Sequence, residues 1–577
     1  MKQTLKYESE QPNSLYDPNG SFQSINRRYD IVYGDVMLNF NYNINRFDIA
    51  ATVGWTGRYE NMNNIRVSTN GGLVTENWFD LNASRYTPSS TLQRMELLKT
   101  GYMGTLSLEW DNYLFLELTG RQERSSTLKD QSFFYPSANL SFLFTQAFHM
   151  PSWWNYGKLR LSYGIVGNAP ETYTANIVYE QGSDNGFTWN TIPSSWGNAD
   201  IRPEKKYEYE IGLESKFLNN RLGIDVSYYN NRVKDQILST PQPSTSGVKN
   251  VLMNVGEVAN HGWDISISAT PILTRDFRWD LTANYGVYKN KVVKLADGVP
   301  YLEILNSGGS GIKIQAVEGQ PMGDIYAQVP QVNENGEYLV SDKGLYLNQT
   351  ELQKVGNINP AGVGGLFNSF SYKNVFLDFS IDFRIGGDVI NEMNQYATAV
   401  GLTPESLKYR DTEHGGLSYY YPGDNNSSGI PVQVDPSTGA GPNGEIIYHD
   451  GIILPGVVAS TGERNTRIIP AGYYYNTTYN WGTEAEQLTY RHSVFDNSYV
   501  KLRELTIGYQ FPEKMISKLG LGRLSVSVFG RNLFYFYKAL KNYDAESSVG
   551  TSWANQATVG SSTTATRSFG VSLRASF

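Results

Sequence analysis

The last eleven residues, Arg567 to Phe577, read R-S-F-G-V-S-L-R-A-S-F. Phe569, Val571 and Leu573 alternate with serine, glycine and arginine, which is the period-two pattern of a strand with one apolar and one polar face. The stretch is long enough to cross a bilayer as a tilted strand of about 9 to 11 residues, and it ends on an aromatic residue. We therefore expect a transmembrane antiparallel β-barrel.

The composition fits this expectation and excludes several other classes of protein. Apolar residues make up 40% of the 577 residues, and the 41 tyrosines and 55 glycines supply amphipathic rings and turns. No run of about 18 apolar residues is present, so a helical membrane span is excluded. The absence of cysteine excludes disulfides and thiol nucleophiles. A net charge of −8 argues against a nucleic-acid partner.

The same alternation recurs along the chain, in about fifteen strands of the kind that outer-membrane barrels use. Short connections alternate with long ones, as periplasmic turns and external loops do. A soluble sandwich or propeller has no reason to keep its long loops at one end. We expect a polar loop over residues 1–28 and a partial barrel over residues 29–577, with long outer loops near 57–94, 167–206, 290–364, 386–497 and 535–566.

Strand direction adds a further expectation. If the short turns are periplasmic, the first clear strand and the last one run in the same direction. An antiparallel barrel cannot close on two such neighbours, so another strand must precede Met1 or come from a second chain. The first ten residues hold no apolar core of a secretory signal. We therefore expect this sequence to be the carboxy-terminal part of a larger protein.

Five segments in order carry a resemblance to a known family. They read L-R-L-S-Y-G-I-V-G-N at 159–168, G-N-A-D-I-R-P-E-K-K-Y-E-Y-E-I-G-L-E at 197–214, N-V-G-E-V-A-N-H-G-W-D-I-S-I at 254–267, D-N-S-Y-V-K-L-R-E-L-T-I-G-Y at 496–509 and G-R-N-L-F at 530–534. The chain resembles the barrel portion of a TonB-dependent transporter of the SusC/RagA type from the Bacteroidetes. The resemblance implies a 22-stranded barrel in the outer membrane of a Gram-negative bacterium. It also implies a plug domain, a SusD-like surface lipoprotein as partner and energy supplied through TonB. A TonB box and a plug domain are not found in these residues.

Aromatic clusters in the expected outer loops are the candidates for solute binding or for docking of the lipoprotein. Flat amphipathic rings offer large contact area to a sugar or peptide, although they also pack loops and form membrane girdles. The clusters are Phe187, Trp189 and Trp196; Tyr419, Tyr420 and Tyr421; and Tyr473, Tyr474, Tyr475 and Trp481.

Three charged residues of one expected strand, Asp378, Asp382 and Arg384, share its polar parity. We expect them to face the lumen, where they contact a hydrophilic solute or the plug, or pair with one another. The five histidines have no metal-ligand spacing, and no hydrolase, zinc-protease or phosphate-loop motif occurs. We expect neither a cofactor nor a metal, and no enzymatic activity.

Two functions remain open from the sequence. The first is a barrel segment of a TonB-dependent importer that takes up oligosaccharides, or peptides, across the outer membrane. The alternative is a passive outer-membrane pore or a surface-binding barrel without TonB coupling.

Overall fold

The computed structural model describes residues 2–9, 19–129, 131–184, 186–307, 311–423, 429–480, 489–517, 520–547, 552–560 and 565–577. Sixteen long strands of these residues belong to a large antiparallel sheet, against the roughly fifteen expected. The chain divides into two compact units, residues 1–151, 156–213 and 229–259, and residues 152–155, 214–228 and 260–577. Among the described residues, no helix is both long and apolar enough to span a membrane.

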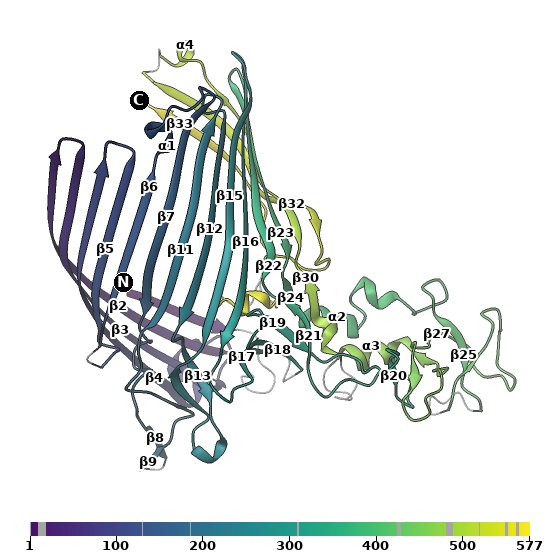
Figure 1. Ribbon diagram of the computed structural model, residues 1–577. Coiled ribbons are helices and arrows are strands. Elements are labelled where there is room, and N and C mark those ends of the chain that lie inside the picture. The colour runs from purple at the N-terminus through teal and green to yellow at the C-terminus, as the bar shows by residue number, and fades with distance from the viewer. Residues whose placement is uncertain are drawn as a thin grey trace. The chain divides into compact units, whose positions relative to one another are not determined.

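The first unit is built on consecutive long strands that pair with their neighbours in sequence (Figure 1). They are β1 (Lys2–Ser9), β2 (Ser21–Ile44), β3 (Phe47–Leu73), β4 (Ser84–Trp110), β5 (Leu114–Ser125), β6 (Ser132–Phe142) and β7 (Trp154–Asn168). The strands β11 (Glu204–Phe217), β12 (Leu222–Lys234) and β15 (Glu257–Leu273) have residues in both units, as does β7. The remaining elements are short: η1 (Leu81–Ala83), α1 (Phe144–Ala147), β8 (Glu180–Asp184), β9 (Phe187–Thr191), β10 (Ser195–Trp196), β13 (Ile237–Pro241), η2 (Ser244–Ser246) and β14 (Asn250–Asn254).

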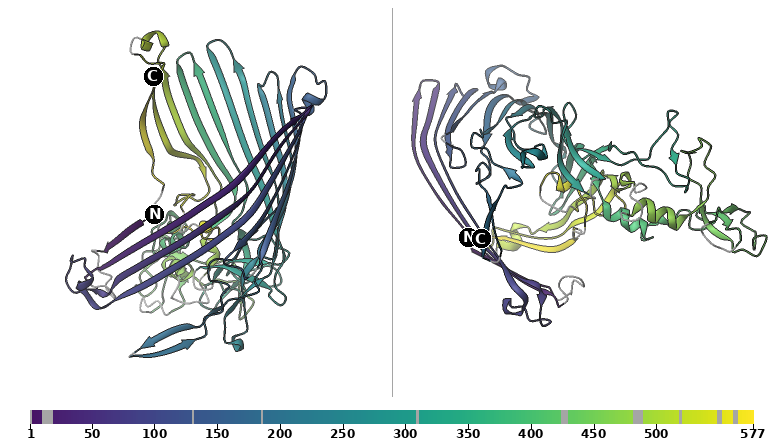
Figure 2. Two further views of the ribbon diagram at one scale, coloured as in Figure 1. Left: turned by 90° about the vertical axis from the view of Figure 1, so that its left-hand side faces the viewer. Right: turned by 90° about the horizontal axis from the view of Figure 1, so that it is seen from below.

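A tight turn sets the register of the first long hairpin. Asn45 and Arg46 connect Ile44 to its partner Phe47, and Asn45 has a φ of 54°, in the left-handed region that asparagine tolerates. From there β2 and β3 pair residue by residue up to Gln23 and Ser68. Figure 2 shows β2, β3 and β4 (purple to blue) running side by side over their length.

Two of the expected loops are wrong over much of their length. The expected loop 57–94 holds paired strand residues from Gly57 to Ser68 in β3 and from Ser89 to Arg94 in β4. The expected polar loop 1–28 holds β1 and the start of β2, which pair from Lys2 with Arg28 to Ser9 with Ser21. Both segments hold only scattered apolar residues, such as Leu5, Tyr59 and Ile65, so the regular apolar alternation disappears from the sequence. The ladder itself is made of backbone hydrogen bonds, which need no apolar side chains.

The second unit continues with β16 (Phe277–Lys294), β22 (Pro360–Tyr372), β23 (Val375–Gly386), β31 (Tyr499–Gln510), β32 (Arg523–Lys538) and β33 (Ser568–Ser576), each hydrogen-bonded to the next. The register of β31 shifts between Leu502 and Glu504 against both neighbours, which is a β-bulge at Arg503. The carboxy-terminal stretch is confirmed as strand β33.

The long connections of the second unit carry most of its small elements. The connection before β22 holds β17 (Tyr301–Ser307), β18 (Ile312–Val317), β19 (Asp324–Ala327), β20 (Leu339–Val340) and β21 (Gln353–Asn357). The connection between β23 and β31 holds β24 (Asp388–Ile390), α2 (Glu392–Ala399), η4 (Pro404–Leu407), β25 (Leu417–Tyr420), β26 (Val432–Gln433), β27 (Tyr448–Ile452), β28 (Val457–Val458), β29 (Ile469–Pro470), α3 (Ala471–Tyr479), η5 (Tyr490–Ser493) and β30 (Val494–Asp496). Beyond β31 lie α4 (Glu513–Ile516) and, between β32 and β33, η7 (Asn555–Ala557).

Most of the buried apolar side chains lie in the connections, and only a few lie on the long strands. The largest cluster, which we name the loop core, draws on three connections of the second unit, those between β16 and β22, β23 and β31, and β32 and β33. It consists of Ile312, Ile314, Ile325, Ala327, Ile358, Ile390, Tyr490, Val494, Ala554 and Ala557. By contrast, Phe569, Val571 and Leu573 of β33 are 73%, 72% and 69% exposed.

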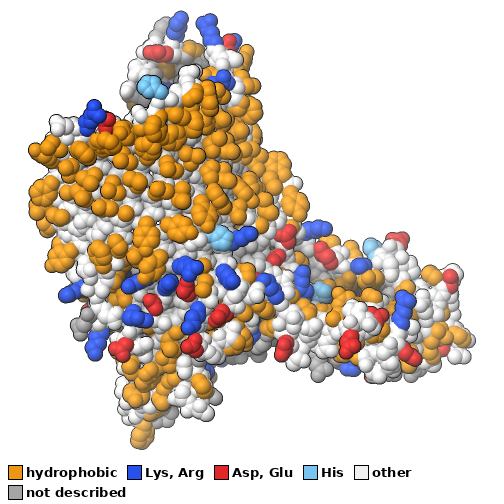
Figure 3. Space-filling model, viewed as in Figure 1, with side chains coloured by type: hydrophobic (Ala, Val, Ile, Leu, Met, Phe, Trp, Pro, Cys, Tyr) orange, Lys and Arg blue, Asp and Glu red, His pale blue; other side chains and the backbone are white. Residues whose placement is uncertain are grey.

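The exposed apolar side chains form a band on the strands. Figure 3 shows hydrophobic side chains gathered over β5, β6 and β7 of the first unit. Charged side chains gather nearer to the long connections of the same unit (Figure 3). A face of this kind is stable against lipid tails rather than against water. The expected two-faced strand is therefore present along the chain.

Candidate functional site

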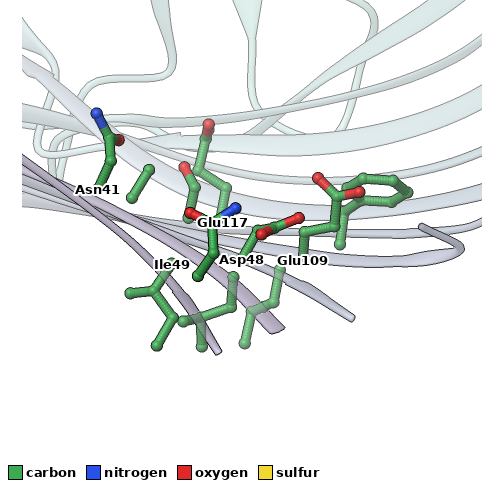
Figure 4. A pocket seen from close by; sticks show the side chains of 11 residues that line it. Asn41, Asp48, Ile49, Glu109 and Glu117 are labelled. Atoms are coloured by element: carbon green, nitrogen blue, oxygen red, sulfur yellow. The ribbon is translucent and has the colours of Figure 1, made fainter. Parts of the chain in front are cut away.

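The polar face of β2 to β5 is the first candidate surface. Asp48 and Glu109 are paired across β3 and β4, and Glu117 of β5 pairs with Ser107, two residues from Glu109 along β4. Their carboxylates point to the same side as the Asn41 amide, whereas Ile49 points away (Figure 4). Together with neighbouring side chains they line an open groove of about 440 Å³. The surface offers hydrogen-bond acceptors and donors to a hydrophilic molecule.

A second groove, of about 400 Å³, is lined by residues of β5, β6 and β7. The Arg121 guanidinium donates to Glu123 Oε2 at 2.8 Å and to Thr56 Oγ1 at 3.1 Å. The Tyr135 hydroxyl donates to the carbonyl of Gly167 at 3.3 Å. These residues were not predicted from the sequence, although Arg121 and Glu123 share the polar parity of β5. That parity was the available signal.

The three charged residues expected in the second unit share one face of β23 through their parity. Asp382 accepts a hydrogen bond from Arg503 Nε at 2.6 Å. Arg384 donates to the carbonyls of Ile358 at 3.0 Å and Gly386 at 3.1 Å, so it fixes the start of the connection after β23. Asp378 pairs with Thr506 of β31. That these side chains face a lumen stays a prediction.

The hairpin of β8 and β9 presents the most exposed aromatic rings of the expected clusters. Phe187 is 78% exposed and Trp189 is 47% exposed. Trp189 is paired with Gly182, and a Cβ added there would lie 2.6 Å from the indole. One face of the indole therefore lies against the glycine backbone, and a role of these rings in solute binding stays a prediction. Trp196 is less exposed and contacts Tyr179 edge to face, with the ring centroids 5.7 Å apart.

The tyrosines at 419–421 are buried, with exposed fractions of 1%, 9% and 5%. The Tyr419 hydroxyl donates to Asp450 Oδ1 at 3.0 Å, and its ring packs edge to face on Tyr421. Burial and the neighbouring Asp450 carboxylate raise the pKa of Tyr419. In this structure the rings pack the connection between β23 and β31, and a role in solute binding stays a prediction.

The third cluster lies on α3. Tyr475 is buried, and its hydroxyl donates to the carbonyls of Glu405 at 2.9 Å and Lys408 at 3.3 Å. Burial, with Tyr479 beside it, raises the pKa of Tyr475 to about 12. Tyr473 and Tyr474 pack against the buried cluster of Leu345, Ile452, Leu454 and Ile469. Trp481 lies outside the described residues, so the structure brings only the three tyrosines together.

A further polar cluster was not expected from the sequence. It joins Lys501 and Arg503 of β31 to Glu546, which lies in the connection after β32. The two cations have the spacing of a single strand face, but their anionic partner is more than forty residues away in the sequence. Among the described residues, no group of three or more histidine and acidic side chains is arranged to hold a metal ion.

The fold and the two-faced strands define the class of this protein as a transmembrane antiparallel β-barrel. The chain belongs to the family of TonB dependent receptor-like β-barrels, whose family model matches residues 2–330.

Two relatives and a solved structure place the chain within this class. TonB-dependent receptor P3 of Formosa agariphila is 24% identical over 494 residues, which are 78% of this chain and 42% of that protein. TonB-dependent receptor SusC of Bacteroides thetaiotaomicron is 30% identical over 247 residues, 39% of this chain and 24% of that protein. The structure of the RagAB peptide transporter superposes with a TM-score of 0.66 at 18% identity, over 92% of this chain and 55% of that one.

These matches confirm the resemblance to the SusC/RagA type of TonB-dependent receptor. The chain spans less than half of the length of either relative.

Proposed function

We propose that this chain forms the wall, the polar interior and the outer loops of an importer in the outer membrane of a Gram-negative bacterium. The importer takes up oligosaccharides, or peptides, and carries out no covalent chemistry. The observation that carries this proposal is the two-faced strand, which puts apolar side chains toward lipid and leaves hydroxyl, amide and carboxylate groups along a hydrophilic path. In this proposal the barrel includes residues 2–9 and 21–28 as well as residues 29–577.

The exposed rings of β9 support oligosaccharides as the solute. Phe187 and Trp189 offer flat apolar surface, and the polar faces supply the hydrogen-bond partners that sugar hydroxyls need. Peptides are the second solute class, because the solved relative is described as a peptide transporter. Both classes draw on the same groups.

Two protein partners belong to the proposal. TonB would supply energy through a plug domain that lies outside these residues, as the names of the relatives indicate. A SusD-like surface lipoprotein would dock on the outer loops, as the SusC/RagA type implies.

The test measures uptake of a labelled oligosaccharide by cells that make the complete protein containing this chain. Cells that lack its gene are the baseline, and each strain is assayed with and without a protonophore. We expect uptake to depend on the gene and to stop when the proton gradient collapses. Uptake that persists without the gradient, with steady ion conductance in a planar bilayer, favours the passive pore instead.

A pair of variants tests the rings. Replacing Phe187 and Trp189 by alanine should raise the half-saturating concentration of the oligosaccharide roughly tenfold, because each aromatic contact contributes about 0.5–1.5 kcal/mol. Ile192→Ala is the matched control, since Ile192 follows β9 and is 52% exposed but has no ring. Equal effects of the double variant and the control would contradict ring stacking.

A further inference from the structure

Glu546 closes an ion-pair cluster on the polar face of β31. Its Oε1 accepts from Arg503 Nη2 at 2.5 Å and its Oε2 accepts from Arg503 Nη1 at 2.9 Å, which is a bidentate pair. Lys501 Nζ donates to the same Oε2 at 2.5 Å. One carboxylate of the connection between β32 and β33 thus pairs with two cations of β31.

The neighbouring strands β23 and β32 orient the Arg503 guanidinium independently of Glu546. Its Nε donates to Asp382 Oδ2 of β23 at 2.6 Å, and its Nη1 donates to Asn532 Oδ1 of β32 at 2.9 Å. Asn532 has a φ of 53°, a left-handed conformation that asparagine tolerates. Partners on both neighbouring strands therefore keep the Nη1 and Nη2 edge turned toward Glu546, whether or not that carboxylate is present.

The bulge leaves Arg503 outside the regular cross-strand pairs of β31 and β23. Lys501 lies between its partners Asp382 and Tyr535, while Leu502 lies between Ile381 and Phe534 on the opposite, apolar face. Arg503 is the extra residue, and a bulge re-aims a side chain in this way. The polar face therefore carries Arg503 in addition to Lys501.

Glu546 also holds a segment of chain against this face. Asp544 Oδ1 accepts from the Tyr535 hydroxyl at 2.5 Å, and the Ala545 carbonyl accepts from Asn497 Nδ2 at 2.9 Å. Ala545 is 6% exposed and Lys501 is 2% exposed, because the segment 543–547 covers the wall. In this arrangement Lys501 is screened from any solute, whereas the Arg503 side chain stays 30% exposed but has its Nη1 and Nη2 occupied by Glu546.

We propose that Lys501 and Arg503 form a binding site for a carboxylate of the solute, and that Glu546 occupies this site as a latch in the described structure. A preorganised guanidinium beside an ammonium group is the usual partner of a planar oxyanion. When a solute carboxylate takes the place of Glu546, the segment 543–547 is released from the wall. This inference rests on the proposed function. It adds acidic molecules as a class of solute, and binding of such a solute would itself release the segment 543–547.

The experiment uses the complete outer-membrane protein with Ala545→Cys, whose thiol is the only one in these 577 residues. The rate of maleimide labelling reports how often the segment leaves the wall. The probes are an oligogalacturonide, which carries carboxylates, and a neutral malto-oligosaccharide of equal length, at constant ionic strength. We expect the acidic sugar alone to accelerate labelling, by roughly tenfold, since hydrogen bonds to charged groups contribute about that factor.

Two background variants complete the test. Glu546→Ala should label fast without any sugar and show no further acceleration by the oligogalacturonide. Glu504→Ala is the matched control, because Glu504 pairs with Arg531 at 2.9 Å within the wall. It should label like the unchanged protein and keep its response to the acidic sugar.

Labelling that responds to neither sugar, or equally to both, overturns the proposal. So does a Glu546→Ala protein that labels no faster than Glu504→Ala. Because labelling reports binding and not transport, uptake of neutral sugars with an unresponsive thiol would reject the latch and leave the importer intact.

Discussion

The substitution Ile390→Ala tests whether three long connections form one cooperative body. Ile390 is 1% exposed and contributes to the loop core from the connection between β23 and β31. Its carbonyl also accepts a hydrogen bond from Val559 N at 2.8 Å, a backbone contact that the substitution leaves in place. The change therefore removes side-chain packing alone.

The expected magnitude follows from the volume removed. Truncating a fully buried isoleucine to alanine costs about 2–5 kcal/mol, because apolar contacts are lost and a cavity remains. Since about 1.4 kcal/mol corresponds to a factor of ten, local opening should become at least roughly 30-fold more frequent. If the core is cooperative, this increase reaches all three connections.

The assay is hydrogen exchange, measured by mass spectrometry on the detergent-solubilised protein. Peptides over 312–317, 388–390 and 552–560 should exchange faster together, while the paired strands β22 and β23 stay protected. Val400→Ala is the control, because Val400 lies in the same connection and is 64% exposed. Faster exchange confined to 388–390 would refute the reasoning, since the three connections would then open independently.

Three further outcomes are expected in the connections. Burial, with Arg491 beside it, lowers the pKa of His492 to about 4 from 6.5, so exchange in α3 should rise as pH falls from about 6.5 to 4, and His492→Gln should remove this dependence. Gly311→Ala should lower the melting temperature, because its Cβ would lie 1.9 Å from the Tyr490 ring. Tyr419→Phe should destabilise by about 1–3 kcal/mol in denaturant titration, because the Asp450 carboxylate loses a donor.

The sign of the histidine prediction follows from proton binding. The unfolded chain binds a proton near pH 6.5, whereas the folded chain binds it only near pH 4. Between these values the unfolded state holds more protons, so stability rises with pH and is lost as pH falls. The Tyr479 ring of α3 stacks on His492 with the centroids 4.4 Å apart, so protonation of the imidazole acts directly on α3. A profile unchanged by His492→Gln would contradict this cause.

The carboxy-terminal strand was predictable because lipid on one face and polar groups on the other impose a period of two. The hairpin of β3 and β4 beyond Gly57 was not, since apolar residues are only scattered there. The strand β1 was not predictable for the same reason. Outside the apolar band, backbone hydrogen bonds and the register set by the turn determine which residues pair. Neither leaves a recognisable pattern in the amino-acid sequence.

The candidate sites were predictable only as residue types. The rings of the loops could be found in the sequence, but whether they are exposed depends on partners far along the chain. Tyr475 bonds to the carbonyl of Glu405, and Tyr419 to Asp450. Lys501 and Arg503 were visible as two cations of one strand, while Glu546 was not visible as their partner, because its connection has no periodic pattern.

The separation between exposed apolar strand faces and a core that lies mostly in the connections has a consequence for how this protein tolerates change. A side chain such as Val571 meets only fluid neighbours, so any apolar residue of whatever shape serves there. A side chain such as Ile314 meets fixed neighbours and must match their outline. In a saturation-mutagenesis library, we therefore expect two patterns of tolerated substitutions. At exposed apolar positions of the strands, any apolar residue should be tolerated and polar residues should not. At buried positions of the connections, a change in side-chain volume of even one methyl group should reduce stability.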